Sequence, residues 1–218
     1  MKILRSVHNN FLVNSYLLIA GTKQACIIDP GYATAEEWQQ VKLLLQKQQA
    51  QPSMVCITHA HADHIAGLAL LHQDYPNIPI YLHPEGVELY HSYNRYARLM
   101  GLPEADNMPA VTSISSQDNV LHFEGEEIQI KYTPGHAQGS VSFYIPSEKV
   151  VFTGDLLFRM SIGRTDMPGG NYQILEQSIF NQIYTLPDDT IILPGHGDSS
   201  DVAFEKQNNP FVKQKNNI

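Results

Sequence analysis

Short apolar runs bounded by turn residues recur along this chain and predict a protein rich in β-strands. Residues 1–30 read as strands that end at the turn Asp29-Pro30-Gly31. Residues 127–132 alternate apolar and polar side chains, which is typical of a half-buried strand. Four more apolar runs read as strands: residues 54–58, 80–82, 149–152 and 190–193. The sequence therefore predicts strands from one end of the chain to the other.

Amphipathic segments between these runs predict helices. Thr34-Ala35-Glu36-Glu37 is a capping box, which places a helix start at Thr34. The predicted buried face of that helix is Trp38, Val41, Leu44 and Leu45. A second helix is predicted at residues 65–74, and its apolar side is Ile65, Leu68 and Leu71. A later helix, capped by Asn171, is predicted to bury Leu175, Ile179 and Ile183.

A further helix is predicted to begin at Pro84, which suits the first helical position, and to run to about Met100. Gly101 would be its C-cap. Three tyrosines recur on this helix at three-residue spacing: Tyr90, Tyr93 and Tyr96. Packing against the core is the favoured explanation for these rings, and a wall of a substrate pocket is the alternative.

Three segments are predicted to be mainly irregular. Residues 102–119 are rich in Pro, Ser and Asp and read as a loop. Residues 156–170 form a long Gly- and Pro-containing loop directly after Asp155, so we expect them to line a site there. The polar residues 201–218 are predicted to form a short helix and a tail.

Length and composition favour one folded domain with a substantial core. The chain has 218 residues, of which 43% are hydrophobic and 17% are charged. We place a single domain at residues 1–211 and a tail at 212–218. The net charge of −8 argues against a nucleic-acid-binding surface. No apolar stretch is long enough to span a membrane, so neither nucleic acid nor membrane is expected as a partner.

The start of the chain and its cysteines bear on the compartment. Residues 11–20 resemble the apolar part of a signal peptide, but Asn14 and Ser15 interrupt them, and two opening strands explain them better. Cys26 and Cys56 lie in apolar runs without CxxC spacing, so they are predicted to be buried and free. A cytoplasmic protein is the resulting expectation.

The densest group of metal-binding side chains is the hexapeptide His59-Ala60-His61-Ala62-Asp63-His64, directly after an apolar run. Imidazole and carboxylate are ligands that suit zinc, iron and manganese. Four such groups within six residues indicate a cation site. Ligands so close in sequence can point to both sides of one loop, which suggests two ions.

Three downstream apolar runs also lead directly to ligand-type residues, namely His136, Asp155 and His196, and glycine precedes each. Glycine lets backbone and ions approach closely at strand ends. Two ions that share one bridging carboxylate would use all five histidines and both aspartates. The remaining histidines are predicted to be surface or packing residues, with His83 or His91 as alternatives for a pocket: His8, His72, His83, His91 and His122.

With these residues in view, the chain resembles the metallo-β-lactamase superfamily. The resemblance rests on the hexapeptide followed by His136, Asp155 and His196 in that order. Three further stretches are similar to the glyoxalase II group, specifically its short bacterial form: Ile162-Gly163-Arg164-Thr165-Asp166, Leu193-Pro194-Gly195-His196-Gly197 and Asn209-Pro210-Phe211. One departure follows His136, where the family usually has Thr-Pro-Gly-Ser and this chain has Ala137-Gln138-Gly139-Ser140.

The resemblance implies an α/β protein, a four-layer αββα sandwich with the metals at one edge. It assigns His59, His61 and His136 to the first metal, Asp63, His64 and His196 to the second, and Asp155 to the bridge. The expected cofactors are two divalent ions, with zinc favoured and iron or manganese as alternatives. The additional helical domain of longer glyoxalase II enzymes, which supplies glutathione contacts, is not expected because the sequence ends soon after His196.

The expected chemistry is hydrolysis by a hydroxide that both ions share. A divalent ion lowers the pKa of bound water from about 15.7 towards 7. Asp155, as the bridge, and Asp63, which can orient the nucleophile, are the expected catalytic residues. A thioester suits this site because a cysteine-like thiol, with a pKa of about 8.5, departs with little acid assistance. The resemblance implies a glutathione-type thioester such as S-lactoylglutathione as the small-molecule substrate.

Two alternative functions remain open at this point. A mononuclear iron persulfide dioxygenase on a similar scaffold would use His59, His136 and Asp155. Another hydrolase of the same fold, such as a lactonase, is the other alternative. Arg164 is the candidate anchor for a substrate carboxylate, because guanidinium forms bidentate pairs with carboxylates. A structural pair with Asp166 is the competing explanation for that side chain.

Overall fold

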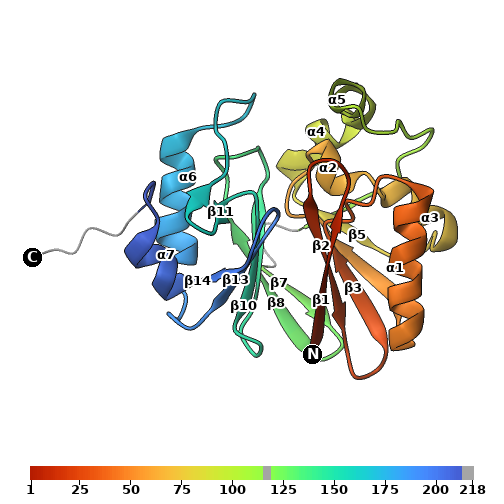
Figure 1. The fold of residues 1–218 in the computed structure, drawn as a ribbon, viewed down its shortest axis with the longest axis horizontal. Coiled ribbons are helices and arrows are strands. Elements are labelled where there is room, and N and C mark those ends of the chain that lie inside the picture. Colours follow the sequence, from red (N-terminus) through yellow and green to blue (C-terminus); the bar gives the residue numbers. More distant parts are fainter. Residues whose placement is uncertain (115–118, 213–218) are drawn as a thin grey trace, which may run out of the picture.

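Two six-stranded sheets face each other and carry helices on their outer sides, as Figure 1 shows for the computed structural model. The structure describes residues 1–114 and 119–212. This four-layer αββα arrangement confirms the expected fold class. Residues 115–118 of the predicted loop lie outside the described residues, as does the predicted tail beyond Val212.

The first sheet comes from the first half of the chain. Its strands lie in sequence order: β1 (Lys2–His8), β2 (Val13–Ile19), β3 (Gln24–Ile28), β4 (Gln51–Cys56), β5 (Ile80–Leu82) and β6 (Thr112–Ser113). β1 to β3 pair antiparallel, and β3 to β6 pair parallel. β2 is buried along its whole length because the sheet is covered on both faces there.

The second sheet comes from the second half. Its order is β14 (Ser200–Asp201), β13 (Ile191–Pro194), β10 (Val150–Gly154), β9 (Val141–Ile145), β8 (Glu126–Tyr132) and β7 (Val120–Phe123). β13 and β10 are parallel neighbours, so their carboxyl ends reach the same edge of the sheet. Every strand predicted from an apolar run is present, with ends shifted by a few residues.

The core has three apolar layers. Leu18, Cys26 and Phe143 lie in the layer between the two sheets. A second layer lies between the first sheet and its helices and includes Ile57. A third layer lies between the second sheet and its helices and includes Ile192. Cys26 and Cys56 are buried and free, as predicted, with their Sγ atoms 3.7 Å apart.

Two predicted helix caps are confirmed. Thr34 Oγ1 accepts a hydrogen bond from the Glu37 N–H at 3.3 Å, and Glu37 accepts one from the Thr34 N–H at 3.3 Å, so α1 (Ala35–Gln48) opens with the capping box. Asn171 Oδ1 accepts from Ile174 N at 3.1 Å and caps α6 (Tyr172–Ser178). α6 runs into the π-helical turn η2 (Ile179–Ile183). α7 (Val202–Asn208) covers the same face.

The helix predicted at residues 65–74 is wrong in its bounds, because the structure has two short helices, α2 (Ala62–Ile65) and α3 (Leu68–Asp74). Gly67 N–H donates to Pro30 O at 2.8 Å instead of to a helical carbonyl. The carbonyl of Asp63 accepts from Asn9 Nδ2 at 3.0 Å. Tertiary contacts therefore interrupt the helix and place Asp63 inside α2.

The helix predicted at residues 84–100 is also divided, into the 3₁₀ turn η1 (Pro84–Gly86), α4 (Val87–His91) and α5 (Tyr93–Met100). The division falls at Ser92, whose hydroxyl donates to Glu88 O at 3.0 Å. Gly101 is the left-handed C-cap, with φ of 69°, as predicted.

Short strands lie in two segments that were predicted to be loops. β6 pairs with β5 inside residues 102–119. Residues 156–170 contain the small hairpin of β11 (Leu157–Phe158) and β12 (Ser161–Ile162). Such two-residue strands carry too little pattern to be recognised from sequence. No helix in the described part of the chain is long and apolar enough to cross a membrane.

Candidate metal centre

The segments that follow four strands converge and bring together the seven predicted ligand residues. Strand β4 leads to His59 and His61 and then to α2, which carries Asp63 and His64; β8, β10 and β13 lead to His136, Asp155 and His196. Three overlapping groups form, each with ligand atoms within 4.8 Å of one another: His59 with His61 and His136, His59 with His64 and Asp155, and Asp63 with His64 and His196. Prediction and geometry therefore select the same residues.

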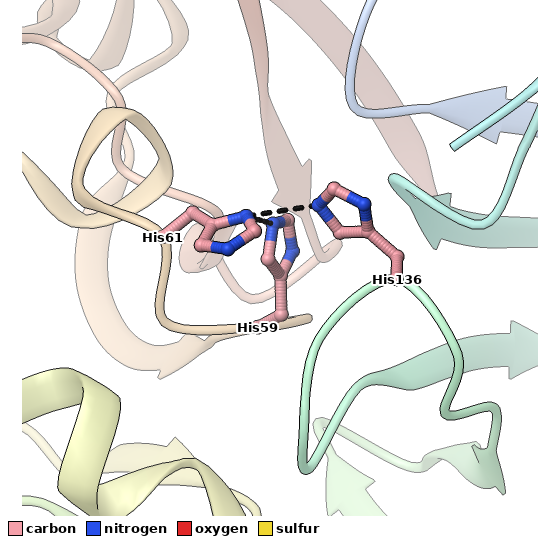
Figure 2. Close-up of side chains that lie close together, drawn as sticks. All are labelled: His59, His61 and His136. Carbon is pink, nitrogen blue, oxygen red and sulfur yellow. Dashed lines mark hydrogen bonds between the residues drawn. The ribbon is translucent and has the colours of Figure 1, made fainter. Parts of the chain in front are cut away.

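The first group consists of three imidazoles that face a common point. His61 Nδ1 lies 3.0 Å from His59 Nε2 and 2.9 Å from His136 Nε2. Figure 2 shows these rings turning their nitrogens towards one another from two different loops. Nitrogens at tetrahedral positions about 2.0–2.1 Å from a zinc ion would be about 3.3 Å apart. The observed separations are close to that value.

The second group combines two imidazoles with one carboxylate. His64 Nε2 and His196 Nε2 are 3.3 Å apart. Asp63 Oδ2 lies 3.5 Å from His196 Nε2 and 3.9 Å from His64 Nε2. This set of nitrogen and oxygen ligands suits the same divalent ions as the first group.

Asp155 lies between the two groups. Its Oδ2 is 3.6 Å from His136 Nε2 and 3.4 Å from His196 Nε2, and its Oδ1 is 3.2 Å from His64 Nε2. Oδ1 is buried and has no well-oriented hydrogen-bond partner among the described residues. A buried carboxylate oxygen without a partner is costly. A cation between the two groups would satisfy it, so the residues present fit a two-metal centre.

Two glycines leave the space that Asp155 occupies. A Cβ on Gly195 would lie 2.3 Å from Asp155 Oδ1 and 2.6 Å from His64 Cε1. A Cβ on Gly163 would lie 1.8 Å from the Asp155 carbonyl oxygen. The close approach expected for a glycine before a ligand is thus present at Gly195.

A cavity of about 200 Å³ opens over the ligands. Its apolar lining includes Phe11, Tyr96, Met100 and Met167, and its polar lining includes His61, Asp63, His136, Asp155, Arg164 and His196. Tyr90 and Tyr93 are buried and donate hydrogen bonds to loop carbonyls, whereas Tyr96 faces the cavity. Packing against the core therefore explains Tyr90 and Tyr93, and a place in the cavity wall explains Tyr96.

Burial lowers the pKa of two histidines of the first group, His59 and His61. Desolvation lowers the pKa of His59 well below its usual value, and neighbouring imidazoles lower it further. Desolvation and His136 lower the pKa of His61 to about 4. Both rings are therefore neutral near pH 7 and offer a lone pair to a metal ion.

Carboxylates reverse this effect in the second group. Desolvation disfavours the charged form of His196, but Asp155 and Asp63 outweigh it and raise its pKa to about 9. The same balance raises the pKa of His64, with Asp155 as the strongest partner. Conversely, burial opposes ionisation of Asp155, but His64 and His196 hold its pKa well below the usual range.

A family model that spans the whole of this site identifies the family. The family model of the metallo-beta-lactamase superfamily matches residues 8–196, which include all seven ligand residues. The chain belongs to the metallo-β-lactamase superfamily. Membership confirms the resemblance that the ligand order indicated.

Curated members of this superfamily are similar over almost the whole chain. The chain is 36% identical over 201 residues to the probable metallo-hydrolase YqgX of Bacillus subtilis, covering 91% of this chain and 92% of that protein. It is 34% identical over 206 residues to the hydroxyacylglutathione hydrolase GloC of Haemophilus influenzae, covering 94% and 95%. The expected similarity to a short hydroxyacylglutathione hydrolase is confirmed.

Solved structures of the superfamily share the fold. BLEG-1, a B3 metallo-β-lactamase, is 34% identical with a TM-score of 0.85 and covers 97% of this chain and 99% of its own. TTHA1623 in a di-iron-bound form is 34% identical with a TM-score of 0.82 and covers 95% and 99%. The second neighbour holds two irons, so the fold accommodates a pair of metal ions.

Two residues that were not predicted as site residues, Asp29 and Thr58, orient ligand residues of the metal centre. Asp29 Oδ2 lies 3.0 Å from His64 Nδ1 and accepts from the Thr58 hydroxyl at 2.6 Å. Thr58 Oγ1 in turn lies 3.1 Å from His59 Nδ1. The sequence indicates Asp29 only as part of a turn. Its position directly after a strand is the same signal that identified the metal ligands, and it could have revealed Asp29 too.

Two backbone carbonyls orient further ligands. His136 Nδ1 donates to Arg164 O at 2.8 Å, and His196 Nδ1 donates to Phe11 O at 2.9 Å. Phe11 lies in the β1–β2 turn, far from the ligand motifs in sequence. These contacts direct the Nε2 atoms of both rings towards the centre.

The side chain of Arg164 pairs with Asp166, which was the alternative to anchoring a substrate carboxylate. Its Nε and Nη2 donate to the two carboxylate oxygens of Asp166, both at 2.8 Å. The pair is largely exposed, and Arg164 also lines the site cavity. Its role as a carboxylate anchor stays a prediction.

Proposed function

We propose that this metallo-hydrolase of the metallo-β-lactamase superfamily cleaves thioesters, such as S-lactoylglutathione. The observation that carries the proposal is the pair of ligand groups joined by Asp155 beneath a small cavity with apolar walls. The 34% identity to a hydroxyacylglutathione hydrolase over 94% of the chain supports the thioester substrate.

The proposed metal ligands are those of the two groups. His59, His61 and His136 would hold one ion, Asp63, His64 and His196 the other, and Asp155 both. When bound, two divalent ions, with zinc favoured, lower the pKa of a water molecule from about 15.7 towards 7 and polarise the substrate carbonyl. The di-iron form of TTHA1623 supports two ions and leaves iron as a candidate metal.

The residues of the chain supply positioning and proton handling. Asp63 is ionised because His64 and His196 lower its pKa against the effect of burial, so it can accept a hydrogen bond from the attacking water. Phe11, Tyr96 and Met100 enclose the acyl group and exclude bulk water. The leaving thiolate requires little protonation because its conjugate acid has a pKa of about 8.5.

The second candidate is a mononuclear iron dioxygenase that uses His59, His136 and Asp155. The intact group of Asp63, His64 and His196 favours the two-metal hydrolase, since one ion would leave these three ligand-type residues unused. A third candidate, another hydrolase of the fold, draws support from the similarity to BLEG-1.

A small-molecule substrate, the absence of nucleic-acid and membrane partners, and a cytoplasmic location belong to the same proposal. The net charge of −8 supports the absence of nucleic-acid and membrane partners, because phosphate-rich surfaces repel a negatively charged protein.

Metal counting and three assays test the proposal. The purified protein is analysed for metal per chain and assayed with S-lactoylglutathione, with glutathione persulfide under an oxygen electrode, and with a chromogenic β-lactam. Two metals per chain with thioester cleavage support the proposal. One iron with oxygen uptake, or β-lactam cleavage without thioester cleavage, would overturn it.

The bridging role has its own prediction. Asp155→Ala removes the carboxylate shared by both groups, so metal content and hydrolysis should fall together. Full metal content with full activity would refute the bridge. Asp189→Ala is the control and should retain both, because Asp189 and its exposed ion-pair partner Lys149 lie at the ends of β13 and β10 opposite to the ligands.

A further inference from the structure

A second cavity, of about 290 Å³, lies beside the site cavity. Its lining includes Ser92, Arg95 and Tyr96 of the α4–α5 region and Gln138, Pro168 and Gly169 of two loops. None of these residues except Tyr96 lines the cavity over the metal ligands. The second cavity is therefore a separate space with its own chemistry.

The two cavities adjoin along three chain segments. Tyr96 lines both. One loop carries His136, which lines the site cavity, and Gln138, which lines the second cavity. Another loop carries Met167, which lines the site cavity, and Pro168, which lines the second. A ligand can therefore extend from one cavity into the other past Tyr96.

The size of the site cavity requires such an extension. Small-molecule sites commonly enclose roughly 300–1,000 Å³, whereas the cavity over the metal ligands has about 200 Å³. It accommodates the acyl end of a thioester but not a peptide-like thiol as well. The thiol part has to leave this cavity, and the second cavity adjoins it at Tyr96.

Charge indicates what the second cavity binds. Arg95 is exposed and forms no ion pair within the described residues. The other arginines near it are already paired, Arg98 with Glu104 at 2.6 Å and Arg164 with Asp166 at 2.8 Å. A guanidinium with free donors in a cavity wall matches a carboxylate of a ligand.

We infer that the second cavity holds the thiol part of the substrate and that Arg95 binds a carboxylate of that thiol. The inference rests on the proposed thioester hydrolysis. Ser92 and Gln138 add polar groups to the same wall, and Gln138 lies in the segment that departs from the usual family pattern after His136. Arg95 thereby determines specificity for the leaving thiol and takes no part in bond cleavage.

Two thioesters with the same acyl group test the inference. S-lactoylglutathione has carboxylates on its thiol, and S-lactoyl-N-acetylcysteamine has none. Arg95→Ala should raise KM for S-lactoylglutathione about fivefold, the value of a well-placed exposed charge pair, and leave kcat nearly unchanged. KM for S-lactoyl-N-acetylcysteamine should not change, and the effect on S-lactoylglutathione should shrink at high salt.

The matched control is Arg98→Ala. Arg98 is an exposed arginine on the same helix that pairs with Glu104 and does not line the cavity. Its removal should change KM for neither thioester. Metal content and unfolding midpoint of both variants are compared with those of the wild-type protein.

Glu88→Gln provides a test of opposite sign. Glu88 lines the second cavity and forms no ion pair with Arg95 in the described structure. Its carboxylate opposes the binding of another carboxylate there, so its neutralisation should lower KM for S-lactoylglutathione.

The outcomes separate the inference from the proposed function. If the wild-type protein cleaves neither thioester, thioester hydrolysis is refuted and the inference falls with it. If it cleaves both and Arg95→Ala changes both KM values equally or neither, only the role of Arg95 is overturned. A rise in KM for S-lactoylglutathione in Glu88→Gln also overturns that role.

Discussion

At the scale of single residues, Asp29 connects the two groups of metal ligands. Its side chain is buried, with 2% of its surface exposed, and contacts His64 directly and His59 through Thr58. Asp29 Oδ1 also accepts from Thr58 N at 2.8 Å. One carboxylate thus orients imidazoles that face different proposed ions.

Asp29→Asn should weaken metal binding without removing a ligand. The amide has one acceptor oxygen instead of two, so the Thr58 contacts and the His64 contact cannot all persist. Loss of such an orienting partner typically costs about 10- to 100-fold in metal affinity or activity. Competition of the protein against a chromogenic chelator measures the change. The exposed Asp189→Asn should bind metal as the wild-type protein does, and equal affinity in both variants would contradict the role of Asp29.

Proton release on metal binding should report the raised pKa of His196. In the metal-free protein this ring keeps its proton at pH 7, below its pKa of about 9, and a metal ion must displace that proton. The affinity for metal should therefore increase as the pH rises from 7 towards 9. The number of protons released per chain should fall by about one as the pH passes through 9. Calorimetric titrations in buffers of different ionisation enthalpy measure this number, and a constant number from pH 7 to 10 would refute the assignment.

At the scale of secondary structure, local signals located the strands and caps but not the interruptions of the helices. The capping box at Thr34 and the cap at Asn171 act within four residues, so sequence suffices to find them. The break before α3 depends on Pro30, whose carbonyl accepts from Gly67, and on the fit of Gly67 against Tyr32. Such contacts between distant segments leave no periodic pattern in the sequence.

The same distinction separates the site residues that were predicted from those that were missed. The seven ligands are recognisable because imidazoles and carboxylates cluster directly after apolar runs. Phe11 and Met100 line the cavity and come from a turn and a helix end with no common spacing. Only the folded chain places these apolar side chains beside His61.

Gly67→Ala should destabilise the protein through a clash between elements. A Cβ at this position would lie 2.2 Å from the ring of Tyr32, which is fully buried and stacked on Trp38 at 4.8 Å. Overpacking of this kind costs about 1–3 kcal/mol in the free energy of unfolding. Urea denaturation measures the change. Gly21→Ala is the matched control, because a Cβ there has nothing within 4 Å; equal stability of the two variants would show that the Gly67 contact is unimportant.

At the scale of the whole molecule, the metal centre joins the two halves of the chain. His59 to His64 follow a strand of the first sheet, whereas His136, Asp155 and His196 follow strands of the second. Each proposed ion takes ligands from both halves. Metal binding should therefore stabilise the contact between the sheets as well as create the site.

Removal of metal should lower the stability of both halves in one transition. A ligand present at 100 times its Kd contributes about 2.7 kcal/mol, which corresponds to about 5–10 °C in Tm for a domain of this size. Fluorescence of Trp38, the single tryptophan, reports on the first half, and far-UV circular dichroism reports on both. Both signals should shift together when a chelator removes the metal. Asp155→Ala, which is expected to bind little metal, should show almost no shift with chelator. A shift confined to one signal would mean that the ions stabilise one half only, and an unchanged Tm in the wild-type protein would refute the coupling between the halves.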